Sequence, residues 1–528
     1  MRARADKGRV IEAISYIRYI KKLLCGRNGV CRLSALRGSL NTEVMAEASF
    51  KTVTFDKSSP FSIYEFSRFL IGQSLHSLFG DGVIDKLRKG KGSLGQMVEE
   101  LFFGYDVNSN RGADFGEANV ELKCTPLLKS KSDGSFRIKE RLICTMIDYF
   151  ELVNTDFEDS HLIAKCKLML ILFYLHVGGT PIYDYEFLFR VLWELPEKDL
   201  LQIKKDYETI ADKVRRGEAH LLSEGDTLYL GACRKGQKGD SKQAQPFSDE
   251  RAHKRAFSLK PAYMRYILSH VVGSGTDYFS NYSEPSVSQF ELVSTEALRT
   301  RRFEEILLSR FEGFYGLNYV EICDKLGMEP YQAKNKYADA CGLIASNGAS
   351  KRLSTAEEFV KSGIVMKTIR LRPNGMPKEA MSFKNIDYCE IYDNDDWTQS
   401  ELYEIFTNRF LFVVFKPIKG EKITIHNNAT GEDVIEEAYV LDKVLFWTMP
   451  AEDIDCAQIY WEHIRKNVTD DNIRLQSFWS IGDHRKFHVR PKATRKIQLV
   501  DNPNGGKCEK YCYWFNQDYL KSIIDSNN

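Results

Sequence analysis

The chain contains two related halves, and this internal repeat is the feature that most limits how it can fold. Six residues of one segment recur later without a gap: Trp193, Pro196, Asp199, Glu208, Ile210 and Val214 match Trp447, Pro450, Asp453, Glu462, Ile464 and Val468. A second block recurs at its own fixed spacing: Lys139-Glu140 with Ile147-Asp148-Tyr149 matches Lys378-Glu379 with Ile386-Asp387-Tyr388. Two matched blocks in the same order are hard to obtain by chance, so we predict two homologous domains.

The composition between the copies sets the domain boundaries. At 528 residues the chain is too long for one ordinary hydrophobic core. A stretch rich in Gly and Ser, from Val272 to Ser288, separates the copies and is typical of a flexible linker or surface loop. We expect a basic N-terminal extension, a first domain, a linker and a second domain at 1–50, 51–272, 273–299 and 300–528. The extension could be a DNA-contacting helix, a frayed segment or a misassigned start.

Each half alternates strand-like and helix-like segments. The longest apolar run, Leu168 to Leu175, has the length and composition of a buried strand. The segments from Leu201 to Val214 and from Ala457 to Val468 are amphipathic at helical spacing. The pattern predicts an α/β fold in which a mixed sheet is flanked by helices. No apolar run approaches the roughly 20 residues that a membrane-spanning helix needs.

Composition indicates a soluble cytoplasmic protein. The net charge of +1 argues against a non-specific DNA coat, which uses a large positive excess to displace counterions from DNA. It does not exclude a site-specific enzyme, which can gather Lys and Arg in one cleft. The twelve cysteines form no CxxC pairs, a pattern that favours reduced thiols over a disulfide framework or a zinc site.

One short motif contains residues suited to catalysis. Glu121-Leu122-Lys123 is the only place in the chain where Glu is followed two positions later by Lys, and Asp114 precedes Glu121 by seven residues. The surrounding residues alternate as in a strand, so Glu121 and Lys123 are expected on the same face. Another acid, Glu99, lies upstream on a helix-like stretch. The simplest alternative is a solvated, charged strand face.

These residue types fit metal-dependent hydrolysis of a phosphodiester. A hard cation such as Mg²⁺ neutralises the charge that builds on the phosphate, and Asp114 and Glu121 supply the carboxylate ligands that this cation prefers. Lys123 is placed to orient or deprotonate the attacking water. Glu99 would support a second metal ion or the lysine. The motif therefore predicts a nuclease site.

Longer stretches resemble a known family. The segment from Lys91 to Glu99, then Asp114, then the segment from Val120 to Pro126 are similar to the MutH family, and most similar to its Sau-type branch of GATC-cutting type II restriction endonucleases. Further matches are Lys139-Glu140-Arg141-Leu142, Leu222-Ser223-Glu224-Gly225 and the segment from Arg255 to Lys260. The resemblance implies two tandem restriction-endonuclease-like domains and Mg²⁺-dependent cleavage of double-stranded DNA at GATC. It also implies the carbonyl of Leu122 as a metal ligand and a cognate DNA methyltransferase as functional counterpart.

The second copy lacks this motif. Val365 stands where the first copy has Glu121, and Lys367 stands where it has Lys123. The counterpart of Glu99 falls near Leu343 or Ile344, and by sequence distance Glu358 could replace Asp114. One acid and one lysine do not make a Mg²⁺ site, because hard cations need several oxygen ligands. We expect the second domain to be a degenerate, non-catalytic copy that binds a second GATC site as an effector.

Basic residues near the ends of two strand-like segments are candidates for DNA contact. Arg490-Pro491-Lys492 looks like the Arg-Pro-Lys element of the MutH family, in which Arg can pair with guanine. The first domain keeps Lys235 but has Cys233 in place of the Arg. Lys260 matches a lysine of the family, and Asn516 fills its position in the second copy. The alternative for the two segments is a solvated basic turn.

Two other functions remain open. A mismatch-repair-type enzyme would nick GATC rather than cut both strands, although the repair family resembles only a single domain. A DNA-binding regulator with a decayed nuclease fold would have no use for the clustered acids Glu99, Asp114 and Glu121. Since one catalytic centre must cut two strands, we expect two chains to pair on DNA or the strands to be nicked in sequence.

Overall fold

A computed structural model describes residues 53–82, 93–105, 112–129, 134–235, 241–274, 277–279, 290–427, 430–492 and 498–526. From Asp56 onward the chain forms one compact unit. The extension predicted at 1–50 lies outside the described residues. No described helix has the length and apolar character required to cross a membrane.

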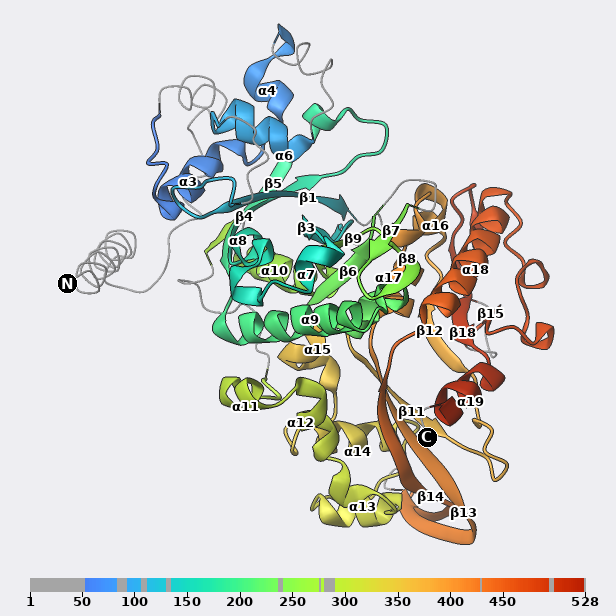
Figure 1. Ribbon diagram of the computed structural model, residues 1–528. Helices are drawn as coiled ribbons and strands as arrows, with labels where there is room; N and C mark the ends of the chain where they lie inside the picture. Colours follow the sequence, from blue (N-terminus) through green and yellow to red (C-terminus); the bar gives the residue numbers. More distant parts are fainter. Residues whose placement is uncertain are drawn as a thin grey trace, which may run out of the picture. The chain divides into compact units, whose positions relative to one another are not determined.

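The first half is built on a mixed sheet of five strands. Its strand order is β10-β5-β4-β1-β2, and β4 lies between β1 and β5 (Figure 1). β1 is parallel to β4, whereas β4 and β5 are antiparallel. The strands are β1 Glu121–Lys129, β2 Phe136–Ile138, β4 Leu168–Leu175, β5 Phe187–Glu194 and β10 Asp277–Phe279. β4 has the bounds of the apolar run in the sequence, and five of its residues are fully buried.

Helices and a second, smaller sheet complete this half. The small sheet has the order β3-β9-β6, with β3 Leu142–Met146, β9 Arg255–Leu259 and β6 Leu230–Arg234. A hairpin of β7 Lys242–Gln245 and β8 Ser248–His253 lies outside both sheets. The helices are α3 Pro60–Phe66, α4 Leu75–Phe79, α6 Leu94–Met97, α7 Tyr149–Leu152, α8 His161–Cys166, α9 Glu197–Arg215 and α10 Pro261–Ser274. The amphipathic segment predicted near 201–214 is part of α9.

The second half repeats this plan. One sheet has the order β11-β13-β14, with β11 Val365–Arg370, β13 Phe410–Asn427 and β14 Glu432–Trp447; the last two form a long hairpin, drawn in orange in Figure 1. The small sheet has the order β12-β18-β15, with β12 Met381–Asn385, β18 Cys512–Phe515 and β15 Phe487–Arg490. Its remaining elements are α16 Tyr388–Asp393, α17 Glu401–Thr407, α18 Ala451–Thr469, α19 Gln517–Ser526, β16 Leu499–Asp501 and β17 Lys507–Glu509. α18 contains the predicted amphipathic segment.

The strand register shows which positions of the two halves are equivalent. In the first half Glu121 is paired with Met169, which is paired in turn with Trp193. In the second half Val365 is paired with Phe410, which is paired with Trp447. Since Trp193 and Trp447 belong to the repeated block, Val365 occupies the position of Glu121. The predicted tandem fold with a degenerate second copy is confirmed.

A shared buried contact supports the same alignment. The Tyr263 hydroxyl donates to the Asp199 carboxylate at 2.7 Å, and the Tyr519 hydroxyl donates to Asp453 at 2.5 Å. Each aspartate lies in the first turn of a 19-residue helix, α9 or α18, which follows a proline. The repeat in the sequence therefore corresponds to a repeat in three dimensions.

One apolar cluster includes residues of both halves, and a second cluster lies within the second half alone. Residues 290–364 fold into α11 Thr295–Thr300, α12 Phe303–Ser309, α13 Tyr319–Lys325, α14 Lys336–Ala345 and α15 Glu357–Ser362. Leu307 and Phe359 of this segment belong to one apolar cluster with Ile203 and Tyr263 of the first half. The range predicted as a linker, 273–299, contains β10 and the start of α11, and its Leu298 is buried. Leu292, Val293 and Leu298 belong to the same apolar cluster, so the described end of this range packs against the first half; the linker boundaries stay a prediction.

Buried ion pairs also join α15 to the first half. The Lys361 ammonium lies 2.7 Å from Asp199, with side chains that are 2% and 0% exposed. Lys198 lies 2.7 Å from Glu358, whose carboxylate also accepts the backbone N–H groups of Leu292 and Val293. Removing one member of such a pair leaves an uncompensated charge in the interior, which is costly.

We predict that Lys361→Met lowers the free energy of unfolding by about 3–5 kcal/mol, because the Asp199 carboxylate stays buried without its cation. Urea unfolding followed by circular dichroism measures the change. The control is Lys416→Met, which removes a lysine that is 57% exposed and paired with Asp442, and should change stability by less than about 1 kcal/mol. Equal unfolding curves for Lys361→Met and the parent protein would show that the Lys361–Asp199 pair does not stabilise the fold.

Candidate active site

The start of β1 brings Asp114 against Glu121. A tight turn connects them: the Phe115 N–H donates to the Val120 carbonyl, and Asn119 adopts a left-handed backbone with φ of 53°. The Asp114 backbone N–H donates to Glu121 Oε2 at 3.2 Å, and the Leu122 N–H donates to Asp114 Oδ2 at 3.0 Å. The loop thus places the two carboxylates side by side at the strand's first residue.

Lys123 lies on the same face as Glu121, as the alternation predicts. Its Nζ donates to Glu121 Oε1 at 2.7 Å. The Glu121 side chain is only 3% exposed. Burial raises the pKa of Glu121; the Lys123 charge opposes this shift, and the Asp114 charge adds to it. The strand therefore holds a buried carboxylate next to an amine.

Glu99 approaches the same cluster from a helical turn. It lies in a π-helical turn, η3 Val98–Phe102, which continues α6, and it is 7% exposed. Burial raises the pKa of Glu99 to about 7, and the negative charges of Asp114 and Glu121 contribute to this shift. The four residues predicted from the sequence are thus gathered in one region of the first half.

Lys165 completes the cluster and was not predicted. It lies on α8, and its Nζ donates to Glu121 Oε2 at 2.8 Å and to Asp114 Oδ1 at 3.3 Å. Burial lowers the pKa of Lys165, but the hydrogen bond from its ammonium to Glu121 and the two carboxylate charges outweigh burial and leave that pKa raised. No motif or spacing marks this residue in the sequence, because only the packing of α8 against β1 brings it near.

The donor set fits a hard divalent cation. One oxygen of Asp114 and one oxygen of Glu121 accept from the same ammonium nitrogen, that of Lys165. The two carboxylates therefore already share one positively charged partner. Oxygen ligands of this kind suit Mg²⁺. Among the described residues, no group of three or more His, Cys, Asp or Glu side chains is arranged as a complete metal site. The carbonyl of Leu122 as a further ligand stays a prediction.

The equivalent place in the second half has no carboxylate. Val365 fills the position of Glu121, and the Lys367 ammonium donates to the Ser382 carbonyl at 2.9 Å. The suggestion that Glu358 replaces Asp114 is wrong, because Glu358 is 2% exposed and paired with Lys198. Ile344, near the predicted counterpart of Glu99, is buried in the apolar core.

The basic residues predicted to contact DNA occupy three different environments. Lys235 is exposed directly after β6, and Lys492 is exposed two residues after β15. Arg490 is partly buried, and its guanidinium lies 3.8 Å from the ring centroid of Trp514. The strand register places Cys233 and Arg490 at equivalent positions, as the sequence alignment of the halves suggested. DNA contact by these residues stays a prediction.

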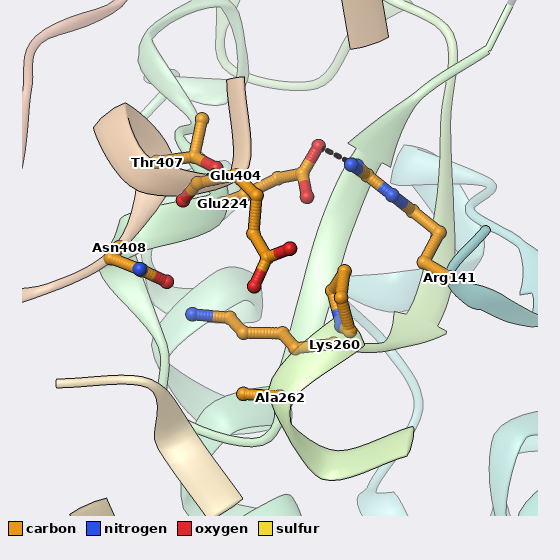
Figure 2. A pocket seen from close by; sticks show the side chains of 8 residues that line it. Arg141, Glu224, Lys260, Ala262, Glu404, Thr407 and Asn408 are labelled. Atoms are coloured by element: carbon orange, nitrogen blue, oxygen red, sulfur yellow. Dashed lines mark hydrogen bonds and ion pairs between the residues drawn. The ribbon is translucent and has the colours of Figure 1, made fainter. Parts of the chain in front are cut away.

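Lys260 is not on the surface. It is 5% exposed, and its ammonium donates to the Thr227 carbonyl. Burial lowers the pKa of Lys260 to about 8, against the opposing charges of Asp206 and Glu224. Figure 2 shows its side chain in a small pocket that is also lined by Arg141, Glu224 and residues of α17. A DNA contact by Lys260 would need this pocket to open, and it stays a prediction.

The pocket belongs to a polar contact between the halves. The Arg141 guanidinium donates to the Glu224 carboxylate, which also accepts the Tyr403 hydroxyl at 2.6 Å. The Gly225 carbonyl accepts from Arg409 at 3.1 Å and from the Thr448 hydroxyl at 2.9 Å. A Cβ on Gly225 would lie 2.3 Å from the Thr448 side chain, so only glycine fits. Two of the blocks that carry the family resemblance thus form this contact.

Comparison with known proteins agrees with this geometry. The family described as DNA mismatch repair enzyme MutH matches residues 103–206, which include Asp114, Glu121, Lys123 and Lys165. The type II restriction enzyme Sau3AI of Staphylococcus aureus is 29% identical over 501 residues, covering 86% of this chain and 96% of that enzyme. The DNA mismatch repair protein MutH of Shewanella woodyi is 24% identical over 190 residues, which are 35% of this chain and 80% of that protein.

A second repair protein gives a similar result. MutH of Shewanella amazonensis is 27% identical over 172 residues, which are 31% of this chain and 73% of that protein. The mixed sheet, its flanking helices and the acids at the start of β1 define a restriction-endonuclease-like domain. The chain is thus similar to the MutH family over residues 103–206 and to a Sau-type restriction endonuclease over most of its length.

We predict that Lys165→Met destabilises the protein in EDTA by about 2–4 kcal/mol, because Asp114 and Glu121 then repel each other without a shared cation. Adding MgCl₂ should stabilise this variant more than the parent protein, since the ammonium no longer competes for the carboxylate oxygens. Thermal unfolding with and without Mg²⁺ measures both effects. The control is Lys167→Met, which removes an exposed lysine directly after α8. A Mg²⁺-independent melting temperature in Lys165→Met would contradict a cation site between the two acids.

Proposed function

We propose that this protein is a type II restriction endonuclease that hydrolyses double-stranded DNA at GATC with Mg²⁺. The observation that carries the proposal is the convergence of Asp114 and Glu121 on one cationic point beside Lys123. Similarity to the MutH family supports deoxyribonuclease activity, and the similarity to Sau3AI over 86% of the chain supports the restriction type.

Each residue of the cluster has a distinct role in this proposal. A divalent cation held by Asp114 and Glu121 supplies the positive charge that the reacting phosphate needs. Lys123 orients the attacking water and, once its ammonium has lost a proton, can accept the proton of that water. Lys165 neutralises the two carboxylates until the cation binds, and afterwards its ammonium is free to face the phosphate. Glu99 supports a second metal ion or Lys123, in keeping with its proximity to both ligand carboxylates.

The second half acts as an effector in this proposal. It repeats the fold but has Val365 instead of the acid, so it can bind DNA and cannot hold the cation for hydrolysis. Its Arg490 forms no side-chain hydrogen bond with any described residue, which leaves the guanidinium available for guanine or phosphate. Binding of a second GATC site there would favour cleavage in the first half.

The partners follow from the same proposal. A cognate methyltransferase would protect the host's own GATC sites, and the enzyme would work in the cytoplasm, where both meet the DNA. One catalytic centre has to cut two strands, so two chains pair on the DNA or one chain nicks the strands in sequence.

A mismatch-repair-type nickase is the second candidate. The Shewanella MutH proteins match this chain over 31–35% of its length, whereas Sau3AI matches 86%. A protein of two tandem domains therefore fits the restriction branch better. A non-cutting regulator is disfavoured by the buried acids, because burial of the Glu121 carboxylate is unfavourable unless a cation or an amine is bound beside it.

We predict that the purified protein cuts both strands of a GATC-containing plasmid in the presence of Mg²⁺ and that Glu121→Ala lowers the rate by at least about 100-fold. Agarose gels that separate supercoiled, nicked and linear DNA give the measurement. Glu117→Ala, which removes an exposed acid from the same turn, is the control and should leave cleavage unchanged. Nicked product alone would favour the repair enzyme, and a mobility shift without cleavage would favour the regulator.

We also predict that a plasmid with two GATC sites is cut faster than a plasmid with one, at low enzyme concentration, because the second half binds the additional site. Initial rates on supercoiled plasmids that differ only in the number of sites test this. Equal rates on both plasmids would remove the effector role and leave the nuclease assignment intact.

A further inference from the structure

The second half has lost the acid at the position of Glu121 and kept a lysine at the position of Lys123. The strand register places Val365 at the position of Glu121, so Lys367 occupies the position of Lys123. It also places Arg490 and Lys492 at the positions of Cys233 and Lys235. Three basic side chains therefore come from β11, from the end of β15 and from the turn after β15.

Hydrogen bonds join two of these cations to one strand. The Lys367 ammonium donates to the Ser382 carbonyl at 2.9 Å, and the Lys492 ammonium donates to the Phe383 carbonyl, the next residue of β12, at 3.3 Å. The Lys367 nitrogen also lies 5.3 Å from the ring centroid of Phe383. The two ammonium groups are thus anchored to neighbouring residues of β12.

Arg490 is fixed to the same sheet by Trp514. Its guanidinium lies 3.8 Å from the Trp514 ring centroid, and the Trp514 indole N–H donates to the Arg490 carbonyl at 3.1 Å. Trp514 on β18 is paired with Ser382 on β12, whose carbonyl accepts from Lys367. Stacking restricts the guanidinium to one plane and leaves its edge for a ligand.

Among the described residues, these cations have no close ion-pair partner, although the charge of Glu379 acts on Arg490. In the part of the chain that the structure describes, Lys367, Arg490 and Lys492 form no ion pair within 4.0 Å of a carboxylate. Burial and then repulsion by Lys492 lower the pKa of Lys367 to about 8. The Nε of Arg490 is buried without a hydrogen-bond partner. Charges gathered in this way are unfavourable alone and are stabilised by an anion.

We propose that the degenerate active site of the second half is a metal-independent phosphodiester-binding site, in which Lys367 and Lys492 hold a phosphate of the DNA backbone beside Arg490. The proposal rests on the proposed function, in which this half binds DNA, and it assigns a role to Lys367. In the first half the acids repel phosphate until a cation is present. In the second half replacement of the acid by Val365 removes that repulsion, so DNA is held there without a metal ion.

Binding in EDTA separates the two halves. Fluorescence anisotropy with a short labelled GATC duplex and the full-length protein reports mainly on the second half, because without a divalent cation the first half presents three acids balanced only by Lys123 and Lys165. We predict that Lys367→Met weakens this binding by about 5- to 20-fold and lowers the slope of log affinity against log salt by about 1. Methionine preserves the length and apolar contacts of this partly buried side chain.

Three further variants give the controls. Lys384→Met removes a lysine of β12 that is 69% exposed and paired with Glu401, and it should change affinity by less than about 2-fold. Lys367→Arg keeps the charge and should retain most of the affinity. Val365→Glu restores an acid beside Lys367 and should weaken binding in EDTA by at least about 10-fold. Thermal unfolding of every variant shows whether it is folded.

The outcomes distinguish this inference from the proposed function. If Lys367→Met and Val365→Glu bind DNA in EDTA as tightly as the parent protein, the phosphate site is disproved, even where GATC cleavage is normal. If the parent protein binds only with Mg²⁺, metal independence is disproved. If it neither binds nor cuts GATC-containing DNA under any condition, the proposed function itself fails.

Discussion

Repulsion among buried carboxylates is the constraint on which the arrangement of this protein depends. Asp114, Glu121 and Glu99 approach one another in a partly dehydrated region, where each negative charge opposes the next. Such a cluster is stable only when cations lie within it, and Lys123 and Lys165 fill that role. The first half therefore folds around a charge balance that a divalent cation can take over. The second half, without the acids, has the opposite imbalance and an excess of positive charge.

The divergence of the two halves extends from the catalytic position to the recognition face. By strand register, the first half has Gly231, Cys233 and Ser258 at the positions of His488, Arg490 and Trp514 in the second half. Small side chains leave room near Lys260 and Glu224, since a Cβ on Gly231 would lie 3.7–3.8 Å from them. Arg141 and Tyr403 fill the adjoining space and meet at Glu224. This face of the first half is thus covered by contact with the second half. The equivalent face of the second half has an arginine stacked on a tryptophan.

The sequence predicted the repeated fold well because the repeat is carried by core residues. Trp193, Asp199 and their counterparts are fixed by packing and by buried hydrogen bonds, so their spacing survives in both copies. Glu121 and Lys123 were predictable because a strand places residues two apart on the same face. Lys165 was not, since its approach depends on the packing of α8 against β1, and helix packing leaves no local pattern. The burial of Lys260 escaped prediction for the same reason: α17, which covers its pocket, is more than 140 residues away in the chain.

The retention of Lys367 follows from physical cost. A partly buried lysine without a carboxylate destabilises the fold, and the position is flanked by Phe383 and by the second ammonium of Lys492. An apolar residue would fit the same surroundings with less strain, as Val365 does two residues earlier on the strand. If the second half served only to support the first, packing alone would favour that replacement. Retention of this lysine is explained if a negatively charged ligand offsets the unfavourable free energy of its unpaired charge. The DNA backbone is such a ligand.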